Sequence, residues 1–391
     1  MEIDFVVGIA IFIFMIGFAL LYITYYFSSL QVSTAEFRDK AIEIFNNIFS
    51  SYEEEYSEHE IGVLKPIKRI PIIISETTGY NLKNEPIPIN ITFDNLCKKE
   101  AWNSTIRVYD ENFTEIPNKI SYSNLCFDQY LNFSLITIFA NLSANSNKKL
   151  YIYFSNDSDV IPKSYLSNLS LYYKFDESEN ISIDYSGNEK TGILKNGTAN
   201  CYNEDCPTWT TGKFFGALYF DGINDYVDCG DVGENIKTIE FWIKTNNINQ
   251  KILQLNSSAG VLLQEGNVTT YDISSPTIYV NGIISPTINQ NEWNYVVIIT
   301  NNGIKADLCK IGSFGNEYFN GSIDEIRFWK DVKDENYILS RNISLPDIKI
   351  YPEEEIKIIS FSKMLQMKNL SYEFVKGLIE EGYKFRIEIY K

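Results

Sequence analysis

Oxygen-bearing side chains are concentrated in one short loop, IDYSGNEKTG at 183–192. Asp184, Ser186 and Asn188 stand there at alternate positions around Gly187. Calcium takes about 6–8 oxygen ligands from carboxylates, amides and backbone carbonyls. The loop therefore predicts a calcium site with Asp184 as its first ligand. The alternative is that Asp184 and Asn188 only bond their own backbone and shape a tight turn.

The six cysteines could serve as disulfide partners or as metal ligands. No two of them form a C-x-x-C pair and His59 is the single histidine, so disulfides in an oxidising compartment are favoured over zinc. Following the order of the domains, the expected pairs are Cys97 with Cys126, Cys201 with Cys206, and Cys229 with Cys309. Spacing alone leaves other connectivities open.

Sequons for N-glycosylation, Asn-x-Ser/Thr, are more numerous than the composition predicts, and all of them follow residue 89. This excess favours an extracytoplasmic, glycosylated body with surface loops at these positions. The candidate sites are Asn90, Asn103, Asn112, Asn132, Asn141, Asn156, Asn168, Asn180, Asn196, Asn256, Asn267, Asn320, Asn342 and Asn369.

The segment that would attach this body to a membrane is the uncharged run at 5–27, FVVGIAIFIFMIGFALLYITYYF. As a helix it is long enough to cross a hydrocarbon core of about 30 Å. It has neither the basic start nor the cleavage site of a signal peptide, so a single-pass membrane anchor is expected. Flanking charge is uninformative about orientation, and the cysteines and sequons place the C-terminal body outside the cell.

Beyond the anchor the periodicity changes twice. Apolar residues recur at helical spacing within 28–62, which predicts an amphipathic stem that packs either on its own domain or on neighbouring copies. From 65 onward, β-branched and aromatic runs alternate with Asn, Gly, Pro and Ser clusters. We expect a mainly β body: a small β-sandwich at 65–157, a second at 165–345, and a tail of strand, helix and strand at 346–391.

The second β block resembles the laminin-G-like, concanavalin A-like jelly-roll family over 169–344. The segments that carry the resemblance are LYYKFDES (171–178), GALYFDGINDYVDCGD (216–231), TIEFWIK (238–244) and KIGSFGNEYFNGSIDEIRFWKD (310–331). The resemblance implies a core position for Trp242 and Trp293, and it implies that Asp324 lies near the loop with Asp184 as a further calcium ligand. A weaker cation set is Asp221, Asn224 and Asp225.

Two other parts resemble known proteins. STIRVYDENFTEIPNKI (104–120) and NKKLYIYFSND (147–157) are similar to a domain of unknown function found beside such jelly rolls in prokaryotic surface proteins. The apolar helix and stem look like the start of an archaeal type IV pilin-like protein, although the basic leader of pilins is missing.

Catalysis is not expected from the sequence. The jelly-roll family includes glucanases that place E-x-D-x-x-E on one strand face, and the nearest string here has Asp324 and Glu325 adjacent. Neighbouring residues of a regular strand point to opposite faces, so Asp324 and Glu325 cannot form a catalytic pair of carboxylates on one face of such a strand.

The expected function is therefore a membrane-anchored binding or adhesion protein, with a glycan or a surface protein as partner. The alternative is a structural subunit of a pilus-like or envelope assembly that contacts copies of itself. Trp209, in the insert at 196–212, could stack on a ligand or cap the core. A net charge of −17 without a basic stripe excludes nucleic acid as an expected partner.

Overall fold

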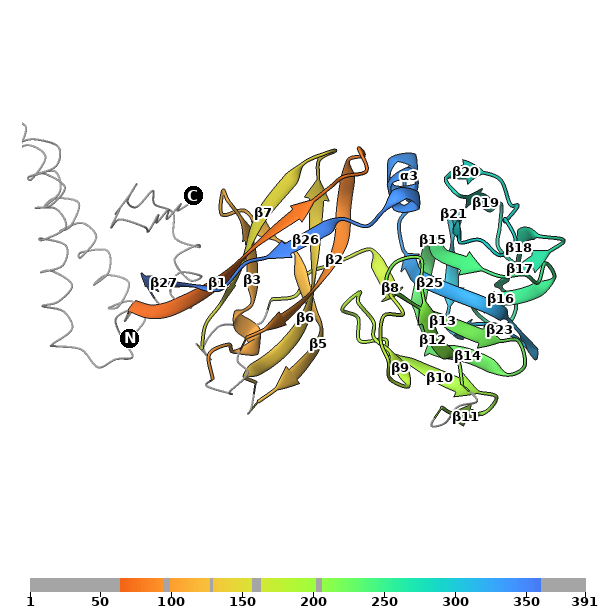
Figure 1. Cartoon of the computed structure of the whole chain (residues 1–391), viewed down its shortest axis with the longest axis horizontal. Helices are drawn as coiled ribbons and strands as arrows, with labels where there is room; N and C mark the ends of the chain where they lie inside the picture. The colour runs from red at the N-terminus through yellow and green to blue at the C-terminus, as the bar shows by residue number, and fades with distance from the viewer. Residues whose placement is uncertain (1–63, 94–98, 127–128, 157–162, 202–205, 360–391) are drawn as a thin grey trace, which may run out of the picture. The chain divides into compact units, whose positions relative to one another are not determined.

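The computed structural model describes residues 64–93, 99–126, 129–156, 163–201 and 206–359 (Figure 1). The chain separates into two compact units, and the unit at 66–357 contains nearly all of the described residues. The predicted anchor at 5–27 and stem at 28–62 lie outside the described residues. Within the described ranges, no helix is both long enough and apolar enough to span a bilayer.

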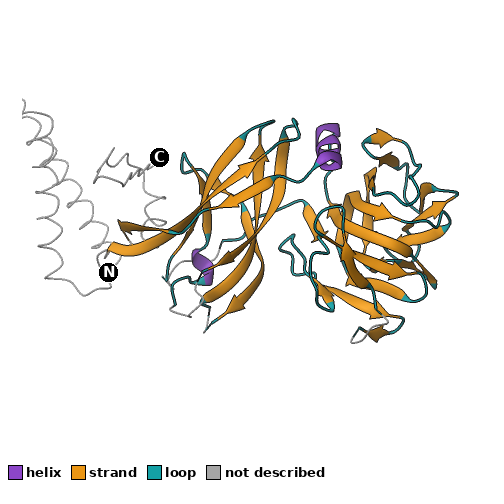
Figure 2. Cartoon of the chain, in the orientation of Figure 1, coloured by secondary structure: helices purple, strands orange, loops and turns teal. Residues whose placement is uncertain are grey.

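Strands dominate the described chain, as the sequence predicts, and the described strands whose register is defined pair in antiparallel fashion (Figure 2). Strand order assigns them to two pairs of sheets and a short two-stranded ribbon, β23 (Ser313–Phe314) with β24 (Glu317–Tyr318). The mainly β fold class is thereby confirmed.

The first sandwich pairs a six-stranded sheet with a three-stranded one. The larger sheet consists of β26 (Asp347–Ile350), β1 (Leu64–Ser75), β7 (Asn147–Phe154), β3 (Arg107–Asp110) and β4 (Glu115–Ile116), with β27 (Glu354–Ile359) also on β1. The smaller sheet consists of β2 (Leu82–Thr92), β6 (Leu131–Leu142) and β5 (Asn118–Leu125).

The second sandwich pairs two eight-stranded sheets. One consists of β11 (Ala199–Asn200), β10 (Gly192–Asn196), β14 (Asp225–Gly230), β22 (Cys309–Ile311), β16 (Gln250–Gln254), β17 (Gly260–Gln264) and β18 (Asn267–Tyr271), with β9 (Ile181–Ser182) on β10. The other, here called the β25 sheet, consists of β12 (Thr208–Thr211), β13 (Gly216–Asp221), β25 (Asn320–Trp329), β15 (Gly233–Lys244), β21 (Asn294–Ala306), β19 (Thr277–Val280) and β20 (Ile283–Ile284), with β8 (Leu169–Tyr173) on β25.

The β25 sheet buries both of its faces. Phe241 and Phe328 belong to the apolar core of the second sandwich, whereas their neighbours Trp242 and Trp329 belong to a cluster shared with the first sandwich. Alternation along a strand explains the split, because successive side chains point to opposite faces. Trp242 is therefore buried, as expected, but not in the core between the two sheets of its own sandwich. Trp293 is only partly buried against the shared cluster.

The chain ends of the described region return to the first sandwich. After the short helix α3 (Glu335–Ile343), β26 pairs with β1 in the register Ile350 to Ile72 and Ile348 to Ile74. The strand predicted at 356–360 corresponds to β27, which also pairs with β1. The first part of the predicted tail domain is thus part of the first sandwich, and the rest of that prediction lies outside the described residues.

Candidate functional site

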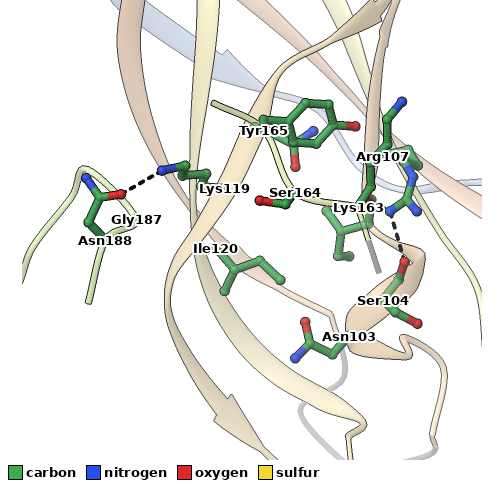
Figure 3. Close-up of a pocket in the computed structure, with 12 residues that line it drawn as sticks. Asn103, Ser104, Arg107, Lys119, Ile120, Lys163, Ser164, Tyr165, Gly187 and Asn188 are labelled. Atoms are coloured by element: carbon green, nitrogen blue, oxygen red, sulfur yellow. Dashed lines mark hydrogen bonds between the residues drawn. The ribbon is translucent and has the colours of Figure 1, made fainter. Parts of the chain in front are cut away.

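A surface pocket of about 390 Å³ lies where the first sandwich meets the loop that follows β9 (Figure 3). The 3₁₀ turn η1 (Asn103–Thr105) and strand β3 form one wall, and residues 118–120 of β5 form another. Lys163, Ser164 and Tyr165 come from the segment that leads into the second sandwich, and Gly187 and Asn188 from the loop. Side chains with hydrogen-bonding atoms therefore dominate the lining.

The two cations on one side of the pocket share one carboxylate, that of Glu115. Arg107 is buried and donates from Nη1 to the carbonyls of Ser104 (2.9 Å) and Ile106 (2.7 Å), while its Nε lies 3.8 Å from the carboxylate of Glu115. Lys163 and the Tyr165 hydroxyl also bond that carboxylate. This half of the pocket is therefore polar, and one of its two positive charges is offset.

Lys119 lines the other side of the pocket, and its hydrogen-bond partner is an amide rather than a carboxylate. Its Nζ donates to Asn188 Oδ1 at 2.7 Å, and no ion pair with a carboxylate is recorded for it among the described residues. Burial lowers the pKa of Lys119, as does the neighbouring charge of Lys330, and Asp184 partly offsets both effects. A lysine in this setting gives up its proton more readily than an exposed one.

Asp184 and Asn188 use their polar atoms to fold the loop. Asp184 accepts from the backbone N–H groups of Tyr172 (3.1 Å), Ser186 (2.9 Å) and Lys190 (3.1 Å), and from the Ser186 hydroxyl (2.8 Å). Its burial raises the pKa of the carboxyl. These contacts match the turn-shaping alternative.

No group of three or more His, Cys, Asp or Glu side chains in the described ranges is placed to hold a metal ion. Calcium at Asp184, Asn188 and Asp324 stays a prediction. In the weaker set, Asp221 Oδ1 accepts from the Ile223 N–H within a local turn, and Asn224 donates to Asn196 of β10.

Asp324 and Glu325 lie together on the face of β25 that is directed away from its own sandwich core. Opposite this point β25 has one residue more than β15: Trp242 pairs with Asp324 and Glu240 with Arg327, so that Phe241 alone faces two residues. Glu325 takes the left-handed conformation (φ 52°) that such a bulge requires. Ile323 and Ile326 both enter the inner core, which leaves the two acids between them on the same face.

The prediction that these acids point to opposite faces is therefore wrong, because the bulge suspends the alternation of a regular strand. Asp324 accepts from the Phe214 N–H at 2.9 Å, and its Oδ1 has no hydrogen-bond partner. Burial, reinforced by the charge of Glu325, raises the pKa of Asp324 to about 9.

A buried polar network continues along this face. Glu325 accepts from the Tyr172 hydroxyl (2.6 Å) and from Arg327 (2.5 Å), and the Arg327 guanidinium lies over the Tyr172 ring at 4.1 Å. Glu240 accepts from Trp329 Nε1 (2.8 Å) and is 3.6 Å from Arg327. The only sequence signal for a second buried face on the β25 sheet was the mixed polar and aromatic composition of SIDEIRFW (322–329).

The cysteine predictions have mixed outcomes. Cys201 and Cys206 form a disulfide, as predicted. Cys229 and Cys309 do not: they are free, buried thiols. The two cysteines lie on the paired strands β14 and β22, so the prediction that they are neighbours is confirmed and the predicted disulfide is wrong. Burial, together with the hydrogen bond to Cys309, raises the pKa of the Cys229 thiol.

Cys126 is disulfide-bonded, and its predicted partner Cys97 lies outside the described residues. Trp209 is partly buried against the core and donates from Nε1 to the Glu179 carbonyl at 3.0 Å, the arrangement of a core-capping residue. No described sequon asparagine is buried, and Asn369 lies outside the described residues. Glycosylation stays a prediction that this exposure permits.

Sequence reasoning missed the pocket itself. Its residues come from segments separated by up to 85 positions, Asn103 to Asn188, and no motif joins them. The one local signal was Gly187, whose positive φ of 72° lets the loop approach strand β5.

Comparisons with known proteins give little. No family model matches the chain, and neither does any curated protein. Among solved structures, a Trypanosoma rangeli sialidase in complex with sialic acid is similar at 8% identity and a TM-score of 0.30, over 59% of this chain and 45% of that one. The chain thus spans less than half the length of that structure.

The prediction that this chain is not an enzyme rested on strand geometry that does not hold at Glu325, and it is corrected on that ground. A likeness at this level assigns no activity to the chain.

Proposed function

We propose that this chain is a surface-displayed binding module whose ligand site is the pocket beside Ser164 and Asn188. The observation that carries the proposal is the composition of that pocket: amide and hydroxyl groups from both sandwiches converge on one cavity. Small-molecule sites are concave and depend on a few convergent polar groups of this kind.

The ligand that suits this lining is rich in hydroxyl groups, as a glycan is. Asn103, Ser104 and Ser164 offer donors and acceptors, and the Tyr165 ring stands beside them. Glu115 offsets one of the two positive charges of Arg107 and Lys163, so this part of the pocket suits a neutral or singly anionic glycan. The ligand-binding role expected from the sequence is therefore proposed here for a glycan of that kind.

Further features support display outside the cell. The Cys201–Cys206 disulfide is typical of oxidising compartments, and every described sequon asparagine is at least partly exposed. The apolar segment at 5–27 would supply the membrane anchor. The two eight-stranded antiparallel sheets support a concanavalin A-like type for the second sandwich.

A glycan array probed with the full chain, with and without a calcium chelator, tests the proposal, followed by calorimetry of the sugars retained. Ser164→Trp fills the pocket with a large side chain at an exposed position and should weaken binding at least tenfold. Ser257→Trp adds the same side chain to an exposed turn and should leave the Kd unchanged.

Equal loss of binding in both variants would place the ligand elsewhere, and failure to retain any sugar would reject a glycan site. Loss of binding with chelator alone would instead identify calcium as part of the site.

A further inference from the structure

We propose that Lys119 and Asn188 join covalently, through an amide bond between Lys119 Nζ and Asn188 Cγ that ties the first sandwich to the second. This inference is independent of the ligand proposed above, because it concerns the wall of the pocket rather than its contents. The two atoms come from β5 and from the loop after β9, segments 69 residues apart in the chain.

The first argument is proximity. Lys119 Nζ is 2.7 Å from Asn188 Oδ1, which places it within about 4 Å of the amide carbon given a C=O length of about 1.23 Å. Attack on a carbonyl carbon proceeds from separations of about 3–3.5 Å. A small rotation of the lysine side chain therefore reaches the reacting geometry.

The second argument is that the contact is held from both sides. Gly187 lies so close to β5 that a Cβ on it would stand 2.5 Å from Lys119 Cβ, and its φ of 72° suits glycine. Two residues further back, the Tyr185 carbonyl accepts from the buried Thr137 hydroxyl of β6 at 2.6 Å. The loop therefore has little freedom to withdraw Asn188 from the lysine.

The third argument concerns protons. The nucleophile must be the neutral amine, and no carboxylate of the described residues forms an ion pair that would hold Lys119 in its charged form. The leaving group is the Asn188 amide nitrogen, which donates to Ser186 Oγ at 2.9 Å, and Ser186 in turn donates to Asp184 at 2.8 Å. A proton can reach the departing nitrogen through Ser186, with Asp184 positioning that hydroxyl.

The reaction balances without an oxidant or a co-reactant. The Nζ–Cγ bond forms, the Cγ–Nδ2 bond breaks, the proton lost by Nζ ends on the leaving nitrogen, and one molecule of ammonia departs. Lys119 and Asn188 both line the surface pocket, which gives the ammonia a route to solvent (Figure 3).

The chain offers its own comparison in a second lysine–asparagine contact. Lys195 also donates to an asparagine, Asn200, across the short β10–β11 pairing. Asn200 is exposed, and no carboxylate or hydroxyl bond to its amide nitrogen is recorded in the described ranges. Proximity without burial and without a proton route should leave this second pair unreacted.

Mass spectrometry of the full chain, produced in a host that does not N-glycosylate and reduced before measurement, tests the proposal. The expected mass is about 17 Da below that of the sequence, the mass of one ammonia. Proteolysis should release a branched peptide that contains Lys119 and Asn188, which separates this bond from succinimide formation at Asn-Gly pairs.

Lys119→Arg keeps the charge and the hydrogen bond but should restore the unreacted mass, whereas Lys195→Arg should still show the 17 Da loss. Ser186→Ala tests the proton route: the soluble variant should react more slowly, with a fraction of unreacted chain that falls over hours. Wild-type protein at the full sequence mass, or a branched peptide that joins other residues, would overturn the proposal.

Discussion

At the scale of single residues, the most unusual group is Asp324, a carboxyl with no exposed surface and one oxygen without a partner. Its raised pKa, about 9, means that it is protonated in the folded protein at neutral pH and ionised in the unfolded chain. Folding then takes up a proton, so stability is greatest below the unfolded-state pKa of about 4 and declines as pH rises toward 9.

We therefore expect Asp324→Asn to raise the free energy of unfolding more at pH 8 than at pH 4. The free energy of unfolding of the variant should therefore depend less on pH between those values. One proton can contribute at most about 1.4 kcal/mol per pH unit, and Glu177, whose pKa burial raises to about 7, adds a remaining slope of the same sign. Urea unfolding at both pH values measures the effect.

Asp307→Asn is the matched control. Asp307 is exposed and bonded to Lys305, which lowers its pKa, so it does not titrate between pH 4 and 9. An unchanged pH profile in Asp324→Asn would show that Asp324 is ionised in the folded state.

Residue-level prediction succeeded where a contact is local in sequence and failed where it depends on the fold. Cys201 and Cys206 are separated by five positions, and the pairing was found. Asp184 was predicted to bind calcium, with turn-shaping as the alternative, and its observed backbone contacts depend on Tyr172 and Lys190. Those partners reach it only after β8 and the loop have been brought together.

At the scale of elements, the helix α3 shows how a buried charge is managed. Arg341 of α3 lies 3.2 Å from Glu85 of β2, and both side chains are 1% exposed. Taking both charges out of water is costly, so the pair stabilises little by itself, but losing one partner leaves the other charge uncompensated.

Arg341→Met should therefore lower the free energy of unfolding by about 3–5 kcal/mol, and adding Glu85→Met should recover most of that loss. Chemical unfolding of the two variants and the wild type forms the measurement. A loss below about 1 kcal/mol in the single variant, the range of exposed pairs, would contradict a buried ion pair.

Strand positions were more predictable than strand irregularities. Along the second half of β2, Ile89 and Ile91 are buried and Asn90 and Thr92 are exposed, an alternation that the residue types themselves predict. The bulge at Glu325 has no such signature, since a left-handed glutamate is unusual and depends on β15 as partner. One unpredicted residue in β25 thus reversed the conclusion about two carboxylates.

At the scale of the whole described body, the return of the chain through β26 joins its end to its beginning. Ile348 is partly buried and faces Ile74, which has no exposed surface. Composition and turn spacing predict a mainly β body. They do not predict the return of β26 to β1, because pairing between segments more than 270 residues apart leaves no periodic trace in the sequence.

Ile348→Asp should cost about 1–3 kcal/mol by placing a charge against the first sandwich. Amide hydrogen exchange should speed up in β1 and remain slow in β15 and β21, which belong to the other sandwich. Lys349→Asp changes an exposed position of the same strand and should leave β1 protected. Equal exchange in both variants would show that β26 contributes nothing to the first sandwich.

The pairing of β26 with β1 also fixes an order of events during synthesis. The first sandwich stays incomplete until residue 350 has left the ribosome, on the order of tens of seconds after β1 at typical elongation rates. The second sandwich, whose strands lie at 169–329, can close in that interval. The first sandwich is therefore completed last, although it begins first in the chain. Until β26 arrives, the unpaired edge of β1 can pair with a strand of another nascent copy.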